Sequence, residues 1–135
     1  MESKKVNRSR MNPLRNLIAS VGLILAGSPL WAADLVMVEQ PGCEWCALWN
    51  KEIGEIYPLS TEGRFAPLKR VDLRAIPEDL DLNRKVIFTP TFLIVEDGRE
   101  VGRIEGYPGE HFFWPVLEKM LIEKTDYRPP GPSSS

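Results

Sequence analysis

The stretch that decides the fold spans residues 35 to 46 and reads Leu35-Val36-Met37-Val38-Glu39-Gln40-Pro41-Gly42-Cys43-Glu44-Trp45-Cys46. Its first four residues form a continuous apolar run, which is typical of a strand that is buried on both faces. Pro41 and Gly42 then turn the chain. After this turn the apolar residues recur at helical spacing, at Cys46, Trp49, Ile53 and Ile56. The stretch therefore predicts a buried strand, a turn and a helix that begins at a pair of cysteines.

The two cysteines are the only ones in the chain, and two residues separate them. We expect Cys43 at the helix N-terminus, where unpaired backbone N–H groups and the helix dipole favour an anion. The pKa of this thiol should therefore lie below the roughly 8.5 of a free cysteine. Cys46 falls one turn later and is turned inward. This arrangement predicts that Cys43 is the nucleophile and that Cys46 is the resolving thiol, which attacks the mixed disulfide and releases the partner.

Two alternatives to redox chemistry stay open for the cysteine pair. A purely structural disulfide is the first, although a bridge that closes so short a loop restrains the unfolded chain little. A copper or zinc dithiolate is the second, because soft metal ions prefer thiolate ligands. The chain offers few further ligands, since its one histidine, His111, is expected on the surface of a distant helix. We therefore expect redox activity without a metal or a cofactor.

The rest of the chain predicts alternating strands and helices. The helix that begins at the cysteines should end near Pro58, and residues 61–67 form a polar connector. Strands are expected over residues 68–73, 91–95 and 100–105, the last two joined by a turn at Asp97-Gly98. Helices are expected over residues 77–85 and 110–124. The order β-α-β-α-β-β-α predicts an α/β fold with a mixed central sheet flanked by helices.

The two ends of the chain differ from its body. Residues 1–33 carry a net charge of +4 and combine a basic head, a short apolar stretch and small residues. This pattern predicts a secretory signal peptide or, alternatively, an uncleaved N-terminal membrane anchor. Residues 34–125 are expected to form one domain, and residues 126–135, rich in proline and serine, a disordered tail. Residues 34–135 carry a net charge of −6, which argues against nucleic acid as a partner.

A second motif, Thr89-Pro90-Thr91, opens the third predicted strand. Proline at the start of a strand often marks no more than a boundary. Together with the cysteine pair upstream, Pro90 indicates a cis peptide bond that places backbone beside the sulfur atoms.

These motifs resemble the thioredoxin superfamily, over residues 35–124. The longer strings Val38-Glu-Gln-Pro-Gly-Cys-Glu-Trp-Cys46, Phe88-Thr-Pro-Thr-Phe92 and Gly102-Arg-Ile-Glu-Gly-Tyr-Pro-Gly109 look like the SoxS-type thioredoxins, which are exported proteins encoded with bacterial sulfur-oxidation genes. The resemblance implies a thioredoxin-like fold and a periplasmic thiol-disulfide reductase, a monomer that receives electrons from a membrane thiol protein. Its partner would be a protein whose cysteine it keeps reduced. A non-catalytic regulatory or metal-binding module of the same fold is the alternative.

The resemblance also implies a partner groove beside the cysteines, formed by Glu44, Trp45, Thr89, Gly106 and Tyr107. Trp45 lies between the sulfur atoms in sequence, and aromatic residues are frequent at interfaces. The chain departs from ordinary thioredoxins at residue 37, where Met37 stands in place of a buried acid. We therefore expect water or another acid, such as Glu39, to accept the proton of Cys46.

Overall fold

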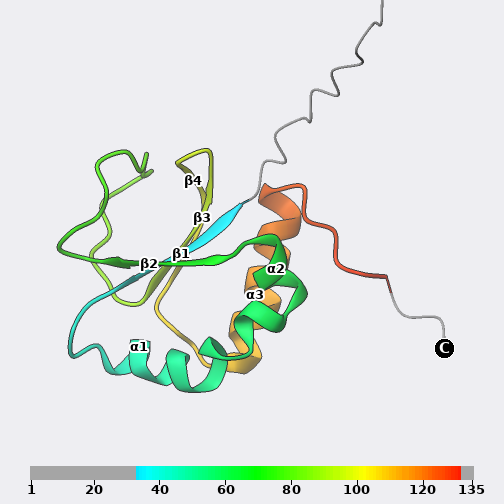
Figure 1. The fold of residues 1–135 in the computed structure, drawn as a ribbon, viewed down its shortest axis with the longest axis horizontal. Coiled ribbons are helices and arrows are strands. Elements are labelled where there is room, and N and C mark those ends of the chain that lie inside the picture. Colours follow the sequence, from blue (N-terminus) through cyan, green and yellow to red (C-terminus); the bar gives the residue numbers. More distant parts are fainter. Residues whose placement is uncertain (1–32, 132–135) are drawn as a thin grey trace, which may run out of the picture.

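The computed structural model describes residues 33–131, which form a four-stranded sheet with helices packed against it (Figure 1). The strands, in their order across the sheet, are β2 (Leu68–Asp72), β1 (Asp34–Glu39), β3 (Thr91–Glu96) and β4 (Arg99–Glu105). β1 pairs in parallel with β2 and antiparallel with β3, and β3 pairs antiparallel with β4. The sheet is mixed, as the sequence predicts, and β1 lies between two other strands.

The helices follow β1 and β4. α1 (Glu44–Trp49) continues directly into η1 (Asn50–Gly54), one turn of π-helix, and the 3₁₀ turn η2 (Tyr57–Leu59) and α2 (Thr61–Phe65) come next. The last helix, α3 (Glu110–Lys124), has the predicted bounds. These elements cover one face of the sheet, where strand residues meet a set of fully buried helix side chains, Trp49, Ile53, Tyr57, Phe113, Leu117 and Leu121.

The opposite face of the sheet has no helix among residues 33–131. Val36, Val38, Leu93 and Val95 point to this face and contact Val86. Further apolar side chains from the segment between β2 and β3 pack around them and are half-buried, namely Leu73, Ile76, Leu80 and Leu82. An irregular segment therefore seals this side of the sheet, and Figure 1 shows it as a long loop.

The helix predicted over residues 77–85 is wrong, because this segment adopts turns and one isolated bridge between Asp81 and Arg99. The backbone N–H of Asp81 donates to the carbonyl of Gly98 at 2.8 Å, and its carbonyl accepts from the N–H of Glu100 at 2.9 Å. These bonds to the β3–β4 hairpin use backbone groups that a helix would pair internally. Tertiary contacts thus override the local helix signal.

The segment predicted as a polar connector, residues 61–67, contains the short helix α2 instead. Ser60 caps this helix, since its hydroxyl accepts a hydrogen bond from the N–H of Gly63 at 2.9 Å. The helix is only five residues long and rests on the 3₁₀ turn before it.

The ordered domain extends beyond the predicted boundary at residue 125. Tyr127 is 3% exposed, its ring packs on Phe65, and its hydroxyl lies 3.1 Å from the hydroxyl of Thr61. The second residue of the tail predicted as disordered from residue 126 therefore packs in the core. The signal peptide or anchor predicted over residues 1–33 lies outside the described residues, except for Ala33, which is buried. Between residues 33 and 131, no helix has the length and apolar character needed to cross a membrane.

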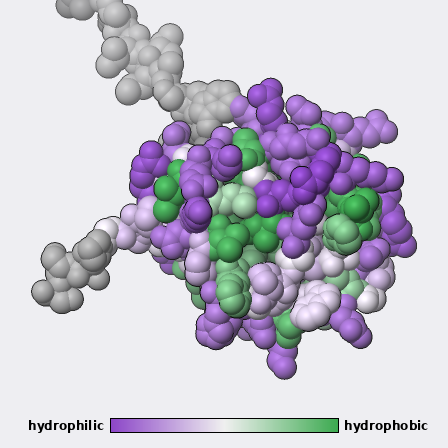
Figure 2. All heavy atoms as spheres, turned by 180° about the vertical axis from the view of Figure 1, so that it is seen from behind, coloured by the Kyte–Doolittle hydropathy of each residue, from purple (hydrophilic) through white to green (hydrophobic). Residues whose placement is uncertain are grey.

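Seen from behind in Figure 2, the surface is largely hydrophilic, and hydrophobic side chains are exposed in separate patches between charged ones. Large apolar residues that remain exposed include Trp45, Ile87, Phe88 and Phe112. Isolated exposed apolar residues are normal on a protein surface, so only their position relative to the cysteines makes them informative.

We predict that Gly63→Ala destabilises the domain by roughly 1–3 kcal/mol, the usual cost of overpacking a core. A Cβ on Gly63 would overlap the backbone carbonyl of Tyr57, whose side chain is fully buried and leaves no room to move. Gly54→Ala is the matched control, because the nearest atom to its Cβ is 3.7 Å away. Urea unfolding followed by tryptophan fluorescence measures both, and equal stabilities of the two variants would contradict the packing argument.

Candidate active site

The cysteines lie where the chain leaves the centre of the sheet. β1 ends at Glu39, and a turn follows in which Gly42 adopts a φ of +79°, a value that favours glycine. The N–H of Cys43 donates to the carbonyl of Gln40 at 3.3 Å and closes this turn. α1 then begins at Glu44 with Cys43 as its N-cap. The predicted strand, turn and helix start are thus confirmed, and they hold the cysteines at the end of the sheet. The predicted helix end near Pro58 is wrong, because the continuous helical segment ends at Gly54 and Pro58 lies in the separate turn η2.

Cys43 and Cys46 form a disulfide, with their Cα atoms 5.2 Å apart. The backbone N–H of Cys46 donates to the Sγ atom of Cys43 at 3.1 Å, so the first sulfur caps the helix. Cys46 is 4% exposed, whereas Cys43 is only half-buried. The two sulfur atoms therefore differ in access to a partner, and the more accessible one also receives a backbone hydrogen bond.

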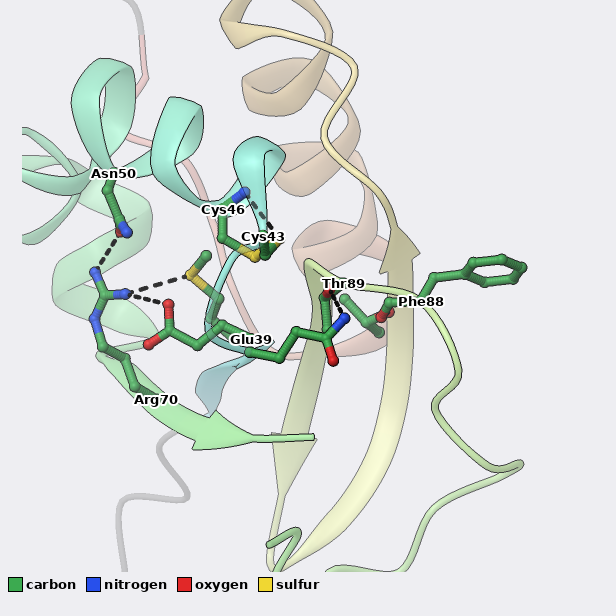
Figure 3. The surroundings of a disulfide bond; sticks show 10 residues. Glu39, Cys43, Cys46, Asn50, Arg70, Phe88 and Thr89 are labelled. Atoms are coloured by element: carbon green, nitrogen blue, oxygen red, sulfur yellow. Dashed lines mark hydrogen bonds and ion pairs between the residues drawn. A yellow bond between two sulfur atoms is a disulfide. The ribbon is translucent and has the colours of Figure 1, made fainter. Parts of the chain in front are cut away.

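The loop before β3 lies beside this disulfide (Figure 3). The Thr89–Pro90 peptide bond is cis, as the sequence predicts. The side-chain amide of Gln40 donates to the hydroxyl of Thr89 at 3.1 Å, which joins the turn before the cysteines to the proline loop. The N–H of Gly106 donates to the carbonyl of Pro90 at 2.8 Å, and Gly106 has a φ of +83°. Thr89, Pro90 and Gly106 are therefore gathered at one end of the domain.

A hollow of about 500 Å³ opens beside the disulfide. Both cysteines line it, together with Glu39, Gln40, Gly42, Glu44, Ala47 and Asn50. A neighbouring pocket of about 370 Å³ shares Glu39 and Gln40 and is also lined by Arg70. The first of the two is the one that reaches the sulfur atoms, so it is the candidate site for a partner's side chain or for water.

Arg70, on β2, lines the neighbouring pocket and joins the end of β1 to Asn50 at the end of α1 (Figure 3). Its guanidinium donates to Glu39 at the end of β1 at 2.9 Å and to the side-chain carbonyl of Asn50 at 2.7 Å. It also lies 3.7 Å from the sulfur of Met37 and 5.8 Å from the ring centre of Trp49. Gln40, Asn50 and Arg70 were not identified from the sequence as residues near the cysteines. For Arg70 no local pattern could have done so, because only the parallel pairing of β1 with β2 brings it opposite Met37.

The residues predicted to form the partner groove differ in their exposure to solvent. Glu44 and Trp45 are exposed next to the cysteines, Trp45 at 59%, and Thr89 is half-buried. Tyr107 does not lie in a groove as expected, because it is 5% exposed and its hydroxyl donates to the carboxylate of Glu52 at 2.6 Å. Burial raises the pKa of this phenol, and the Glu52 carboxylate adds to the rise. Its ring thus packs inside the domain and does not form a partner-facing surface.

The other aromatic residues separate clearly into core and surface. Trp49, Phe92 and Phe113 are fully buried, Trp114 is half-buried and stacks on Tyr57, and Phe112 is exposed. His111 is exposed at the start of α3. In the part of the chain from residue 33 to residue 131, no three His, Cys, Asp or Glu side chains lie close enough together to hold a metal ion.

No family model matches the chain, and no curated protein matches it either. A search of solved structures, however, finds the crystal structure of the periplasmic thioredoxin SoxS from Paracoccus pantotrophus in its reduced form. The two share 50% sequence identity with a TM-score of 0.65, over 67% of this chain and 97% of that chain. Fold, cysteine motif and sequence therefore agree, and the chain belongs to the family of SoxS thioredoxins.

Proposed function

We propose that the chain is a periplasmic thiol-disulfide oxidoreductase that works as a reductase and keeps a cysteine of a partner protein reduced. The observation that carries this proposal is the Cys43–Cys46 disulfide at a helix start, with one accessible and one buried sulfur. The relative in Paracoccus is periplasmic, and the basic and apolar N-terminal sequence fits export. A membrane thiol protein would supply the electrons, and sulfur oxidation is the process that the family relationship favours.

The reaction proceeds by two exchanges. The thiolate of Cys43 attacks a disulfide on the partner, a mixed disulfide forms, and the first partner sulfur leaves as a thiolate. The thiolate of Cys46 then attacks the sulfur of Cys43, which forms the Cys43–Cys46 disulfide and releases the second partner sulfur. Two electrons pass to the partner, and a thiol donor restores the dithiol by the same steps in reverse.

The position of each sulfur supports these roles. The hydrogen bond from the N–H of Cys46 to the Sγ atom of Cys43 stabilises a thiolate at that sulfur more than it stabilises a neutral thiol. Cys46 is buried and cannot meet a partner before Cys43 does. Its attack on the mixed disulfide therefore comes second, once the partner is bound.

Cys46 must lose a proton before it attacks. Met37, on the buried face of β1, carries a thioether that does not accept a proton, so we look for the acceptor in the hollow beside the disulfide. Glu39 and Cys46 line the same hollow, and its volume of about 500 Å³ admits water. We propose that water in the hollow, or Glu39 through it, takes the proton.

We predict that iodoacetamide modifies Cys43 much faster than Cys46 in the reduced, folded protein. Cys43 is half-buried, whereas Cys46 is 4% exposed, so the rates should differ by about tenfold or more. Peptide mass analysis after short labelling measures each rate. Labelling in urea is the control and should equalise the two, and equal rates in the folded protein would refute the assignment of roles.

We predict that Cys46→Ser accumulates mixed disulfides with the natural partner, because no thiol remains to resolve them. Affinity purification of this variant without reductant, followed by release with dithiothreitol, identifies the partner, and Cys43→Ser is the matched control that should trap nothing.

The direction of electron flow follows from the reduction potential of the wild-type pair. A value near roughly −270 mV fits a reductase, and one near roughly −120 mV would show an oxidant instead.

We predict that Glu44→Gln makes the potential of the pair less negative, by less than about 30 mV. The Glu44 carboxylate is next to Cys43 and exposed, so it disfavours a thiolate there and makes the reduced form less stable. Screening by solvent keeps the effect small. Glu55→Gln, an exposed position beyond the end of η1, is the control. A more negative potential in Glu44→Gln would show that the carboxylate does not act as a repelling charge.

A further inference from the structure

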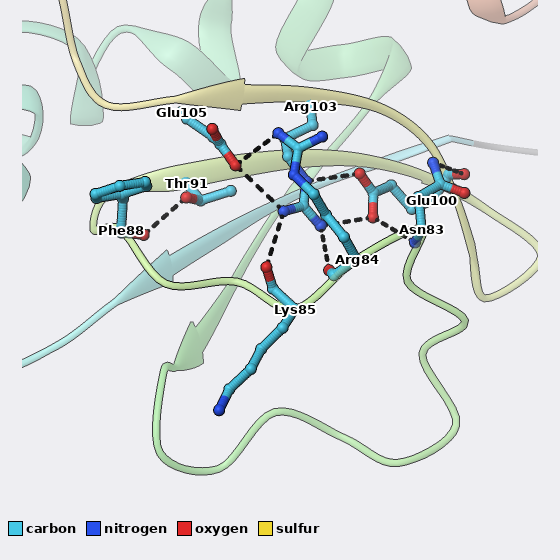
Figure 4. A network of polar contacts seen from close by, with 8 residues as sticks. All are labelled: Asn83, Arg84, Lys85, Phe88, Thr91, Glu100, Arg103 and Glu105. Carbon is cyan, nitrogen blue, oxygen red and sulfur yellow. Dashed lines mark hydrogen bonds and ion pairs between the residues drawn. The ribbon is translucent and has the colours of Figure 1, made fainter.

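Arg103, on β4, uses every N–H of its guanidinium group inside the domain (Figure 4). Its Nε donates to Glu100 at 2.7 Å, and its two terminal nitrogens donate to the second oxygen of Glu100 at 2.8 Å and to Glu105 at 3.3 Å. The remaining two N–H groups donate to the backbone carbonyls of Arg84 at 2.7 Å and Lys85 at 3.3 Å. The side chains of Arg103 and Glu100 are only 5% and 2% exposed. Such a buried ion pair is costly unless every group in it is paired, and here it is.

The same pair holds a second point of the loop that precedes the cis-proline. Glu100 accepts a hydrogen bond from the backbone N–H of Asn83 at 2.9 Å, and the side chain of Asn83 reaches the carbonyl of Glu100 at 3.4 Å. Backbone groups of three consecutive residues, 83 to 85, are thereby attached to β4. Residues 83–85 belong to no helix or strand, so their backbone conformation is fixed by these hydrogen bonds to β4 and not by regular secondary structure.

The network also fixes the next residues along the chain. Val86 is buried against the sheet, and its two successors, Ile87 and Phe88, are 63% and 57% exposed. The carbonyl of Phe88 accepts a hydrogen bond from the hydroxyl of Thr91 at 2.7 Å, and Thr89 is bonded to Gln40 beside the cysteines. Ile87 and Phe88 thus form an apolar tip that is anchored on both sides and leads directly into the loop next to the disulfide.

Ile87 and Phe88 are adjacent in sequence and both exposed, and their position next to the loop beside the disulfide makes them informative. The tip is continuous with the proposed exchange site, since Thr89 belongs to the surroundings of the disulfide (Figure 3). A partner that presents its sulfur to Cys43 brings the chain on either side of that cysteine close to this loop. Preorganised apolar contacts cost less entropy on binding than mobile ones.

We propose that Arg103 is a positioning residue for partner recognition, which holds the Ile87–Phe88 tip so that it packs on apolar residues flanking the partner's cysteine. The inference rests on the proposed reductase function, because it assigns a protein, and not a small thiol, as the substrate that the tip recognises. Arg103 does not touch the sulfur atoms, and its effect is transmitted through the loop carbonyls that it binds.

The test compares a protein disulfide with a small one. Prereduced full-length protein is mixed with insulin or with dithionitrobenzoate, and the two rate constants give a selectivity ratio. We expect Phe88→Ala to lower the insulin-to-dithionitrobenzoate ratio about tenfold, an effect larger than that of most interface residues. Arg103→Lys keeps a cation beside Glu100 but loses the fork that binds the loop carbonyls, and it should lower the ratio about fivefold.

The double variant separates positioning from general damage. Because Arg103 acts through the tip, Arg103→Lys should lower the ratio no further once Phe88 is alanine. Arg99→Lys, on the exposed end of the same strand, and Ile122→Ala, an exposed apolar change on α3, are matched controls that should leave the ratio unchanged. Urea unfolding of each variant shows whether it is folded at the assay temperature.

Three results would overturn the inference. One is an unchanged ratio in Phe88→Ala, and another is a pair of losses that multiply fully in the double variant. The third is an Arg103→Lys variant that is slowed equally toward insulin and dithionitrobenzoate, which would indicate a structural role only. A wild-type protein that exchanges with neither substrate would instead contradict the proposed reductase function, so the two failures are distinguishable.

Discussion

The end of the domain that carries the disulfide depends on the packing of Trp49. This side chain is fully buried, and its ring lies 5.3 Å from Phe92, 5.8 Å from Phe113 and 6.1 Å from Tyr57, centre to centre. Burying about 200 Å² of indole at roughly 25 cal/mol per Å² stabilises the fold by on the order of 5 kcal/mol. This exceeds the cost of about 1–3 kcal/mol for leaving a polar atom unpaired, which applies to the Nε1 of Trp49 within residues 33–131. The helix that carries the cysteines is thereby fixed to the sheet and to α3, and the sulfur atoms keep their unequal exposure.

The two faces of the sheet are stabilised in different ways. Helices cover one face with aromatic and aliphatic side chains, and their backbone hydrogen bonds are internal. The other face is covered by an irregular segment, whose backbone groups must find partners elsewhere. Arg103 and Glu100 supply several of them, and these hydrogen bonds offset the cost of burying two charged side chains. Burial of this pair orders the loop that leads to the cis-proline, so the polar network on one face and the hydrophobic core on the other both support the disulfide site.

The sequence was most informative where the same few residues carry the functional groups and fix the local backbone conformation. The cysteine pair at a strand-to-helix turn and the bounds of α3 were predicted from short stretches, because caps, turns and apolar spacing act over a few residues. The cis bond before Pro90 was predicted from two motifs taken together, the proline and the cysteine pair upstream. The wrong helix over residues 77–85 shows the converse. Its proline and acidic residues are a local start signal, yet hydrogen bonds between Asp81 and the distant β3–β4 hairpin decided the conformation. The prediction that Tyr107 lines a partner groove was wrong for a similar reason. Its sequence neighbour Gly106 lies near the proline loop, whereas the ring of Tyr107 enters the core and its hydroxyl donates to Glu52.

The sequence by itself thus determined the fold class, the cysteine pair at the start of a helix and the place of the cis-proline, because each can be recognised from short motifs and from their order along the chain. The tertiary structure alone decided which polar residues surround the pair. Arg70 meets Glu39 and Asn50 only because β1 and β2 pair in parallel and in one register. Arg103 reaches the carbonyls of Arg84 and Lys85 only because the segment before the cis-proline folds back on β4. Pairing between strands and loops depends on contacts across many residues, and no periodicity in the sequence reports those contacts.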